Sequence, residues 1–315
     1  MNIDGGGFFA NLTGMTLRTR NRLITFSILA GPFIFLLGLL LFWEAEPLPP
    51  VPPLPNPNGY DVLVKAGNII KGNVGNYDEM GQAELHELAQ TNSAAIQLAR
   101  TGLQQPCRVP TQFSQTYMES HINELAALKQ LTQAWVIEGR LAEAENHSAD
   151  AARLYLEIVR LGNESVRGGV IMDQLVGTAI EAIATANLQK LLPQLKAKSC
   201  GETAATLESL DSQRQTWSDV MQQERDWSRR TYSGIRYELA RLMTRKSLDK
   251  AIEKAEQKFK ERQSKTRRLT IDFAARAYEL DKGHPPANLA DLVPDYLKAV
   301  PRDPLTGTNM VYSPR

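Results

Sequence analysis

The sequence predicts a mainly α-helical protein, with one transmembrane helix followed by an extracytoplasmic helical domain, a long helix and a small C-terminal module of turns and one short strand. Three observations support this fold class. Residues 23–43 form an uncharged apolar run, apolar residues recur at helical spacing from residue 60 onward, and residues 203–280 contain no proline and one glycine.

Composition limits the class of protein. The 315 residues carry 36 Lys and Arg against 35 Asp and Glu, a formal net charge of +1. The hydrophobic fraction of 43% is enough for a packed core and excludes the intrinsically disordered class. Two cysteines exclude a disulfide-dense small domain and a cysteine-rich zinc module.

The apolar run Leu23–Trp43 has the length of a transmembrane helix, because 21 residues span about 30 Å. Three arginines and one aspartate precede it, and two glutamates follow it closely. We therefore expect a signal anchor in the cytoplasmic (inner) membrane, with residues 1–22 as a cytoplasmic tail and residues 44–315 outside. A cleaved signal peptide and a buried core helix are alternatives that fit the length and composition less well.

A proline-rich linker is expected over residues 44–58. Glu46–Asn58 contains seven prolines, which favour polyproline II structure and disfavour helices and central strands. At about 3 Å per residue this segment acts as a semi-rigid spacer between the membrane and the folded part.

A helical domain is expected over residues 59–201. Helical spacing of apolar residues predicts helices at residues 78–104, 119–138, 149–161 and 168–192, with Gly162 closing the third. Loops are expected around Pro106 and Pro110 and again at residues 193–201, which places both cysteines in loops.

Within this domain, Trp135, Gly139, Ala151 and Tyr155 have the spacing of a tetratricopeptide repeat, and residues 119–163 resemble one such hairpin. The resemblance implies a bulky anchor and a glycine on the first helix, with Ala151 and Tyr155 packing on it from the second. It also implies that the hairpin binds a protein. A generic helical hairpin is the alternative.

Residues 202–282 are expected to form one or two long charged helices. Within Arg225–Arg268 there are 15 Lys and Arg and six Asp and Glu, a net charge of +9 that the near-neutral total conceals. A solvated helix face is one interpretation, and binding to anionic lipid or a cell-wall polymer is another. Nucleic-acid binding is not expected, because no recognition motif is present.

Residues 283–315 carry the most specific pattern. A helix ends at Gly283, a short helix covers residues 289–293, turns follow at Asp303-Pro304 and Thr306-Gly307, and a short strand is expected at residues 309–312. The segment resembles the C-terminal part of type II secretion major pseudopilins. The matching residues are Tyr278, Leu280, Asp281, Gly283, Pro286, Leu292, Tyr296, Leu297, Pro301, Asp303, Pro304, Gly307 and Tyr312.

The pseudopilin resemblance implies assembly with a secretion or pilus-like apparatus and a calcium ion near this end, for which Asp303 is a candidate ligand. The apolar run at residues 23–43 lacks the glutamate of pseudopilins, so processing as a pilin is not expected. In its whole layout the chain is similar to membrane-anchored helical proteins of unassigned function in planctomycete-like bacteria.

No catalytic, cofactor-binding or metal-binding motif occurs in the sequence. The four histidines form no metal-binding pair, and Cys107 and Cys200 are candidates for a disulfide in an oxidising compartment. We therefore expect no cofactor and a protein-interaction or scaffold function with a protein partner. The alternatives are a component of a secretion or pilus-like apparatus and an extracytoplasmic enzyme whose site is dispersed in sequence.

Overall fold

The computed structural model describes residues 30–33, 48–232 and 235–312, and of residues 235–244 it describes the backbone alone. The chain divides into two compact units, residues 1–51 and residues 52–315. Most of the predicted transmembrane segment, residues 23–43, lies outside the described residues, and so does the cytoplasmic tail. In the part of the chain that is described, no helix has the length and apolarity needed to cross a membrane.

The second unit is built from helices joined by short connections. Their bounds are α3 (Gly59–Asn68), α4 (Gln82–Leu103), α5 (Tyr117–Ala144), α6 (Ser148–Glu164), α7 (Ile171–Leu191), η1 (Leu192–Gln194), α8 (Ala197–Ser212), α9 (Trp217–Thr231), α10 (Ile235–Lys282) and η2 (Leu289–Leu292). Residues 48–58, the described part of the predicted linker, form neither helix nor strand. The mainly α-helical fold class is therefore confirmed.

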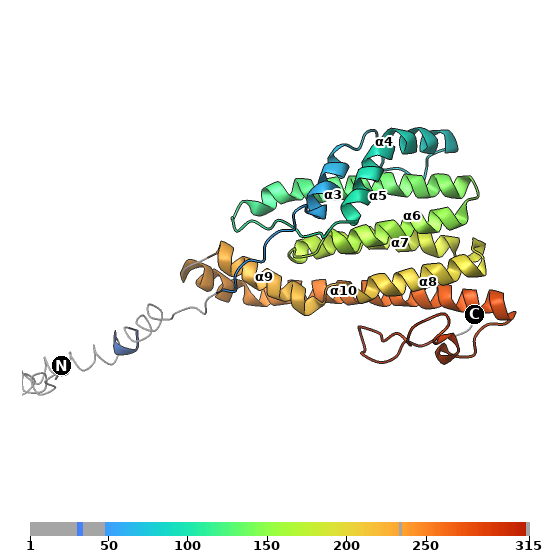
Figure 1. The fold of residues 1–315 in the computed structure, drawn as a ribbon. Helices are drawn as coiled ribbons and strands as arrows, with labels where there is room; N and C mark the ends of the chain where they lie inside the picture. The colour runs from blue at the N-terminus through green and yellow to red at the C-terminus, as the bar shows by residue number, and fades with distance from the viewer. Residues whose placement is uncertain (1–29, 34–47, 233–234, 313–315) are drawn as a thin grey trace, which may run out of the picture. The chain divides into compact units, whose positions relative to one another are not determined.

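Consecutive helices lie side by side and form three layers. Figure 1 shows α3, α4 and α5 in one layer, α6 and α7 in the next, and α8 packed along α10 in the third. One hydrophobic core runs through all three, with Tyr60, Trp135 and Phe273 among its largest buried side chains. The layers therefore form one folded body.

Two glycines set the distance between α6 and α7. A Cβ atom on Gly177 would come within 2.5 Å of the carbonyl oxygen of Gly162, and one on Gly162 within 2.9 Å of the carbonyl oxygen of Gly177. Real Cβ atoms do not approach backbone this closely, so only glycine permits the contact. Gly162 thus lies inside α6 and does not end it, because its role is helix packing and not helix termination.

The long charged region, residues 202–282, is divided into helices differently from the prediction. The last part of α8, all of α9 and all of α10 occupy residues 202–282. Thr216 starts α9 by accepting a hydrogen bond from the amide of Asp219, whose carboxylate accepts one from the amide of Thr216 in return. This capping box marks the start of α9 and so separates α9 from α8. Cys200, expected in a loop, lies within α8 because that helix begins at Ala197.

The C-terminal module is part of the core. Leu289, Leu292, Leu297 and Met310 are buried in it, and the backbone amide of Lys298 donates to the carboxylate of Glu208 on α8 at 3.0 Å. Gly283 ends α10 with a φ of 78°, as expected, and η2 forms the short helix. The strand expected at residues 309–312 is not formed: the described residues show a single bridge there, between Arg302 and Asn309.

Candidate functional site

The structure brings the four predicted hairpin residues together where α5 and α6 pack. Trp135, Ala151 and Tyr155 are fully buried, and the indole nitrogen of Trp135 donates to Glu157 at 3.1 Å. A Cβ atom on Gly139 would lie 2.5 Å from the ring of Tyr155, so the ring occupies the space that glycine leaves. The hydroxyl of Tyr155 donates to Glu143. These residues hold the hairpin together and leave no surface for a ligand.

The predicted disulfide is absent. Cys107 and Cys200 are free thiols, both buried. The Sγ of Cys107 lies against the carbonyl oxygens of Gly102 and Gln105 beside α4, whereas that of Cys200 lies against Leu195 before α8. The two belong to different layers of the molecule. Burial raises the pKa of Cys107 to about 12 and that of Cys200 to about 11, so both remain protonated at neutral pH.

Asp303 stabilises a turn. Its Oδ1 accepts a hydrogen bond from the amide of Leu305, and its backbone pairs with Thr308 and Gly307. Among the described residues no three His, Cys, Asp or Glu side chains gather in a way that could hold a metal ion. The calcium site that the pseudopilin resemblance implies stays a prediction.

A buried histidine that the motif search passed over joins three helices. The Nε2 of His121, on α5, lies 2.6 Å from the Oδ1 of Asp173 on α7, and its Nδ1 lies 2.9 Å from the Oε2 of Glu124. The hydroxyl of Tyr60, on α3, donates to the same Glu124 oxygen at 2.9 Å. Tyr117 stacks on the imidazole ring with 4.7 Å between centroids. The histidine is 1% exposed and Asp173 is fully buried.

The electrostatics of this cluster favour a charged histidine. Burial alone would lower the pKa of His121, but its hydrogen bonds to Asp173 and Glu124 outweigh this and raise the pKa to about 9. The bond to His121 also lowers the pKa of Glu124. At neutral pH the ring of His121 is therefore protonated and hydrogen-bonded to Asp173 and Glu124. The ring of His121 is buried, and its hydrogen bonds, together with the bond from Tyr60 to Glu124, connect α3, α5 and α7.

A second buried ion cluster joins α7, α8 and α10. The Oε1 of Glu181 accepts hydrogen bonds from the Nη2 of Arg214 at 2.6 Å and from the hydroxyl of Thr266 at 2.5 Å. Asp211 accepts from the Nε of Arg267 at 2.7 Å. Burial opposes the charge of Arg214, but Glu181 and Asp211 outweigh it and raise its pKa. Part of the basic stretch is thus used to bind carboxylates inside the fold.

Other cations of the basic stretch lie on the surface. Lys246, Lys250, Lys254 and Lys258 recur at intervals of four residues on α10, and all four are exposed. Intervals of four place them along one slowly turning face, which we call the lysine stripe. Residues 245–251 are exposed without exception, and burial begins with Ala255 and Phe259, whose ring lies 5.6 Å from that of Trp217. We call residues 245–254 the arm.

One sequence signal could have indicated the His121 cluster. Asp173 is an acidic residue near the start of a largely apolar helix, where a carboxylate is costly to bury unless a partner neutralises it. No sequence pattern names that partner, since His121 and Glu124 lie about 50 residues earlier on another helix.

Comparisons of the chain with protein-family models, with curated proteins and with solved structures found no match. The likeness to tetratricopeptide hairpins and to pseudopilins therefore rests on the residues named above.

Proposed function

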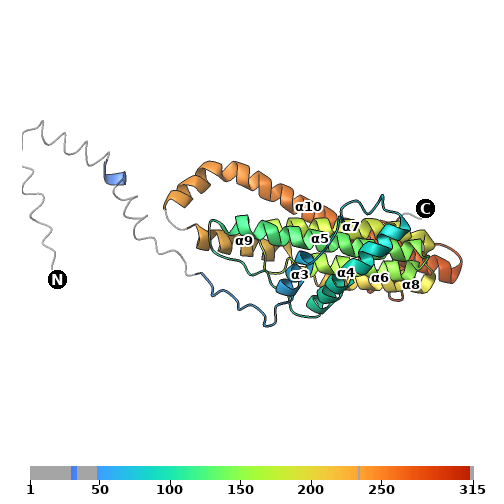
Figure 2. The same ribbon diagram turned by 90° about the horizontal axis from the view of Figure 1, so that it is seen from above.

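We propose that this protein is a single-pass, membrane-anchored helical module that binds a protein partner through the arm of α10, and that the partner presents an acidic surface. The observation that carries the proposal is the state of the arm: ten consecutive helical residues with almost no packing. Figure 2 shows the first half of α10 running apart from the other helices before it joins them.

The arm is unusual on energetic grounds. The arm lies inside the 48-residue helix α10, but most helix stability in proteins comes from tertiary packing, of which the arm has little, and like charges four residues apart lower helix stability further. The arm carries four Lys or Arg and two Asp or Glu, and its Arg245–Asp249 pair, at 3.8 Å, is long. Leu248 is 45% exposed, but it lies two residues from Lys246 and from Lys250 and so on another side of the helix. An acidic partner would neutralise the lysines.

A protein partner fits these features better than an anionic membrane or wall polymer. The stripe extends over about 18 Å along one helix, which is the scale of a helix-sized contact. The stacked helices of the body would hold this helix in place, whereas the protein binding that the tetratricopeptide resemblance implies for the hairpin itself is not part of this proposal. The membrane anchor over residues 23–43 would restrict the search for the partner to the extracytoplasmic face.

The test is affinity purification of the tagged full chain from membranes solubilised in a neutral detergent. Alkaline carbonate should leave the chain in the membrane fraction if residues 23–43 span it. We expect one stable co-purifying protein that Lys246→Glu, Lys250→Glu and Lys254→Glu together abolish. The matching Lys→Arg variant should retain it, because charge and not lysine itself is required.

Lys190→Glu with Lys198→Glu is the matched control for general charge effects, since both lysines are exposed on other helices. Retention of the partner by the arm variant would contradict the proposal. If the arm variant no longer sediments with anionic vesicles but still co-purifies with the same proteins as the wild type, the stripe binds lipid instead.

A further inference from the structure

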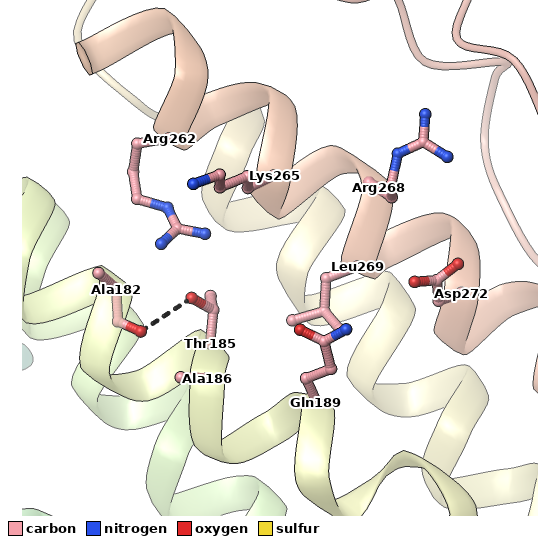
Figure 3. A pocket seen from close by; sticks show the side chains of 9 residues that line it. All are labelled: Ala182, Thr185, Ala186, Gln189, Arg262, Lys265, Arg268, Leu269 and Asp272. Atoms are coloured by element: carbon pink, nitrogen blue, oxygen red, sulfur yellow. Dashed lines mark hydrogen bonds between the residues drawn. The ribbon is translucent and has the colours of Figure 1, made fainter.

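A cavity of about 370 Å³ lies between α7 and α10, away from the arm. Ala182, Ala186 and Leu269 give it an apolar floor, and Arg262, Lys265 and Arg268 line its α10 side (Figure 3). Its volume is within the range of sites that hold small molecules. Neither the proposed protein partner nor the hairpin accounts for three cations around one cavity.

The cations stand at intervals of three residues, so they share one face of α10. Figure 3 shows the guanidinium of Arg262 directed across the cavity toward Ala182 and Thr185 on α7, while Arg268 points away from α7 at the rim. Asp272 also lines the cavity, and it is the one carboxylate among the lining residues. The lining is therefore cationic.

Arg262 differs from the other partly buried arginines of the fold. Arg100, Arg140, Arg167 and Arg214 each bind at least one carboxylate, and each has a raised pKa. No described residue forms an ion pair or side-chain hydrogen bond with Arg262; its buried Nε has no partner, as is also true of Arg140 and Arg214, but those two bind carboxylates through other nitrogens. Burial lowers its pKa, and the charge of Arg214 adds to this. A half-buried cation in this state is costly unless an anion neutralises it.

Glu181 is the carboxylate that opposes this effect, but its Oε1 is already bound to Arg214 and Thr266. The other oxygen of Glu181, Oε2, is buried without a hydrogen-bond partner, but among the described residues it forms no ion pair with Arg262, and Asp211 is bound to Arg267. The cavity thus combines an unsatisfied cation, two further cations at its edge and an apolar floor. Such a set suits a small molecule with an anionic head and a short apolar body.

We propose that the cavity between α7 and α10 binds a small phosphate-bearing molecule, with its phosphate on Arg262 and Lys265 and its apolar part over Ala186 and Leu269. A free phosphorylated metabolite and the headgroup of a phospholipid share this chemistry. Arg262 is the principal anion ligand, because it alone is half-buried, unpaired and directed across the cavity.

Isothermal titration calorimetry of the detergent-solubilised full chain tests the proposal with two probes, inorganic pyrophosphate and the short-chain lipid dihexanoylphosphatidic acid. We expect saturable binding at one site for at least one probe. Arg262→Gln should weaken it by about tenfold or more, since a hydrogen-bonded charge pair contributes on that scale. Tighter binding of the lipid would identify a headgroup site, and tighter binding of pyrophosphate a site for free phosphates.

Arg245→Gln is the matched control, because it removes the same charge from an exposed position on the same helix. Lys265→Gln, at an exposed position, gives a second test in a variant that keeps the buried arginine. Without ligand, Arg262→Gln should be as thermally stable as the wild type or more so, because it removes an unpaired buried charge.

Three results would overturn the proposal. The first is no binding of either probe. The second is equal binding by the wild type, Arg262→Gln and Lys265→Gln, which would place the anion elsewhere. The third is a loss of stability in Arg262→Gln as large as that from breaking a buried ion pair, which would make Arg262 a structural partner of Glu181.

Discussion

At the scale of single residues, the most informative side chain is His121. It contacts Asp173 and Glu124 through its two ring nitrogens and Tyr117 through its face. Asp173 lies in the first turn of α7, and Tyr117 and Glu124 lie early in α5. The raised pKa of about 9 means that the folded protein holds a proton that the unfolded chain releases near 6.5.

This difference sets the direction of a pH effect. Below about pH 6.5 histidine is protonated in both states, so the stabilisation by the cluster is complete. As pH rises toward 9 the unfolded chain loses its proton first, so the free energy of unfolding falls. We expect a loss of about 3 kcal/mol over this window, measured by urea unfolding between pH 5 and pH 10.

His121→Gln should remove that pH dependence and lower stability at pH 6, because it leaves two carboxylates without their cation. His86→Gln, an exposed histidine, is the control and should follow the wild type. Parallel profiles for the wild type and His121→Gln would show that the buried ring is neutral.

A second prediction at this scale concerns Gly139. Gly139→Ala places a methyl group 2.5 Å from the buried ring of Tyr155, whose hydroxyl is held by Glu143. We expect thermal unfolding to show a loss of about 1–3 kcal/mol. Gly201→Ala has open space around its Cβ atom within α8 and should be neutral or stabilising by up to about 1 kcal/mol. Similar effects of the two changes would contradict the packing of the hairpin.

At the scale of elements, the C-terminal module is held by the body of the protein. Leu292 is fully buried, and Arg267 of α10 donates to the carbonyl oxygen of Arg302 at 2.5 Å. Deleting residues 286–315 would uncover core residues of α8 and α10 as well as removing a segment. A deletion is therefore a poor test of whether the module has a role in assembly.

Point substitutions separate these effects. Leu292→Ala should lower the free energy of unfolding by about 2–5 kcal/mol, because it leaves a cavity in the core. Leu305→Ala, at a side chain 49% exposed, should change it by less than about 0.5 kcal/mol. Chemical denaturation measures both. An equal, small effect would mean that the module is not packed as the structure shows.

The elements also show how far the sequence could be interpreted. Apolar periodicity predicted α4 to α7 to within about four residues at each end, except that α5 runs six residues beyond the predicted 138, because each of these helices buries one face. Gly162 was wrongly expected to end α6, since a glycine that packs against a neighbouring helix and one that ends a helix look the same in one sequence. The division between α8 and α9 depends on the capping box of Thr216, which was missed.

The contacts between helices could not be predicted from the sequence. The ion clusters around His121 and Glu181 join residues 33 to 85 positions apart, and no local pattern encodes such pairs. The disulfide between Cys107 and Cys200 was predicted from compartment and count alone, without the positions of the layers, and it is absent from the structure. The four hairpin residues were found because their spacing is local.

At the scale of the whole molecule, the two buried ion clusters and the shared core make residues 52–315 one folded body, from which the arm of α10 is the least supported part. The body would position the arm, and the predicted membrane segment would keep both near the bilayer. The arm is the proposed binding site of the partner.

Site-specific photo-crosslinking from the arm tests this claim most directly. A photo-reactive amino acid at Ser247 or Ala251, both exposed and both outside the stripe, should yield one protein adduct in cells. The adduct should disappear when Lys250→Glu and Lys254→Glu are also present, and the same probe at Lys198 on α8 should not form it. Absence of an adduct from both arm positions, or an equal adduct from position 198, would contradict the account.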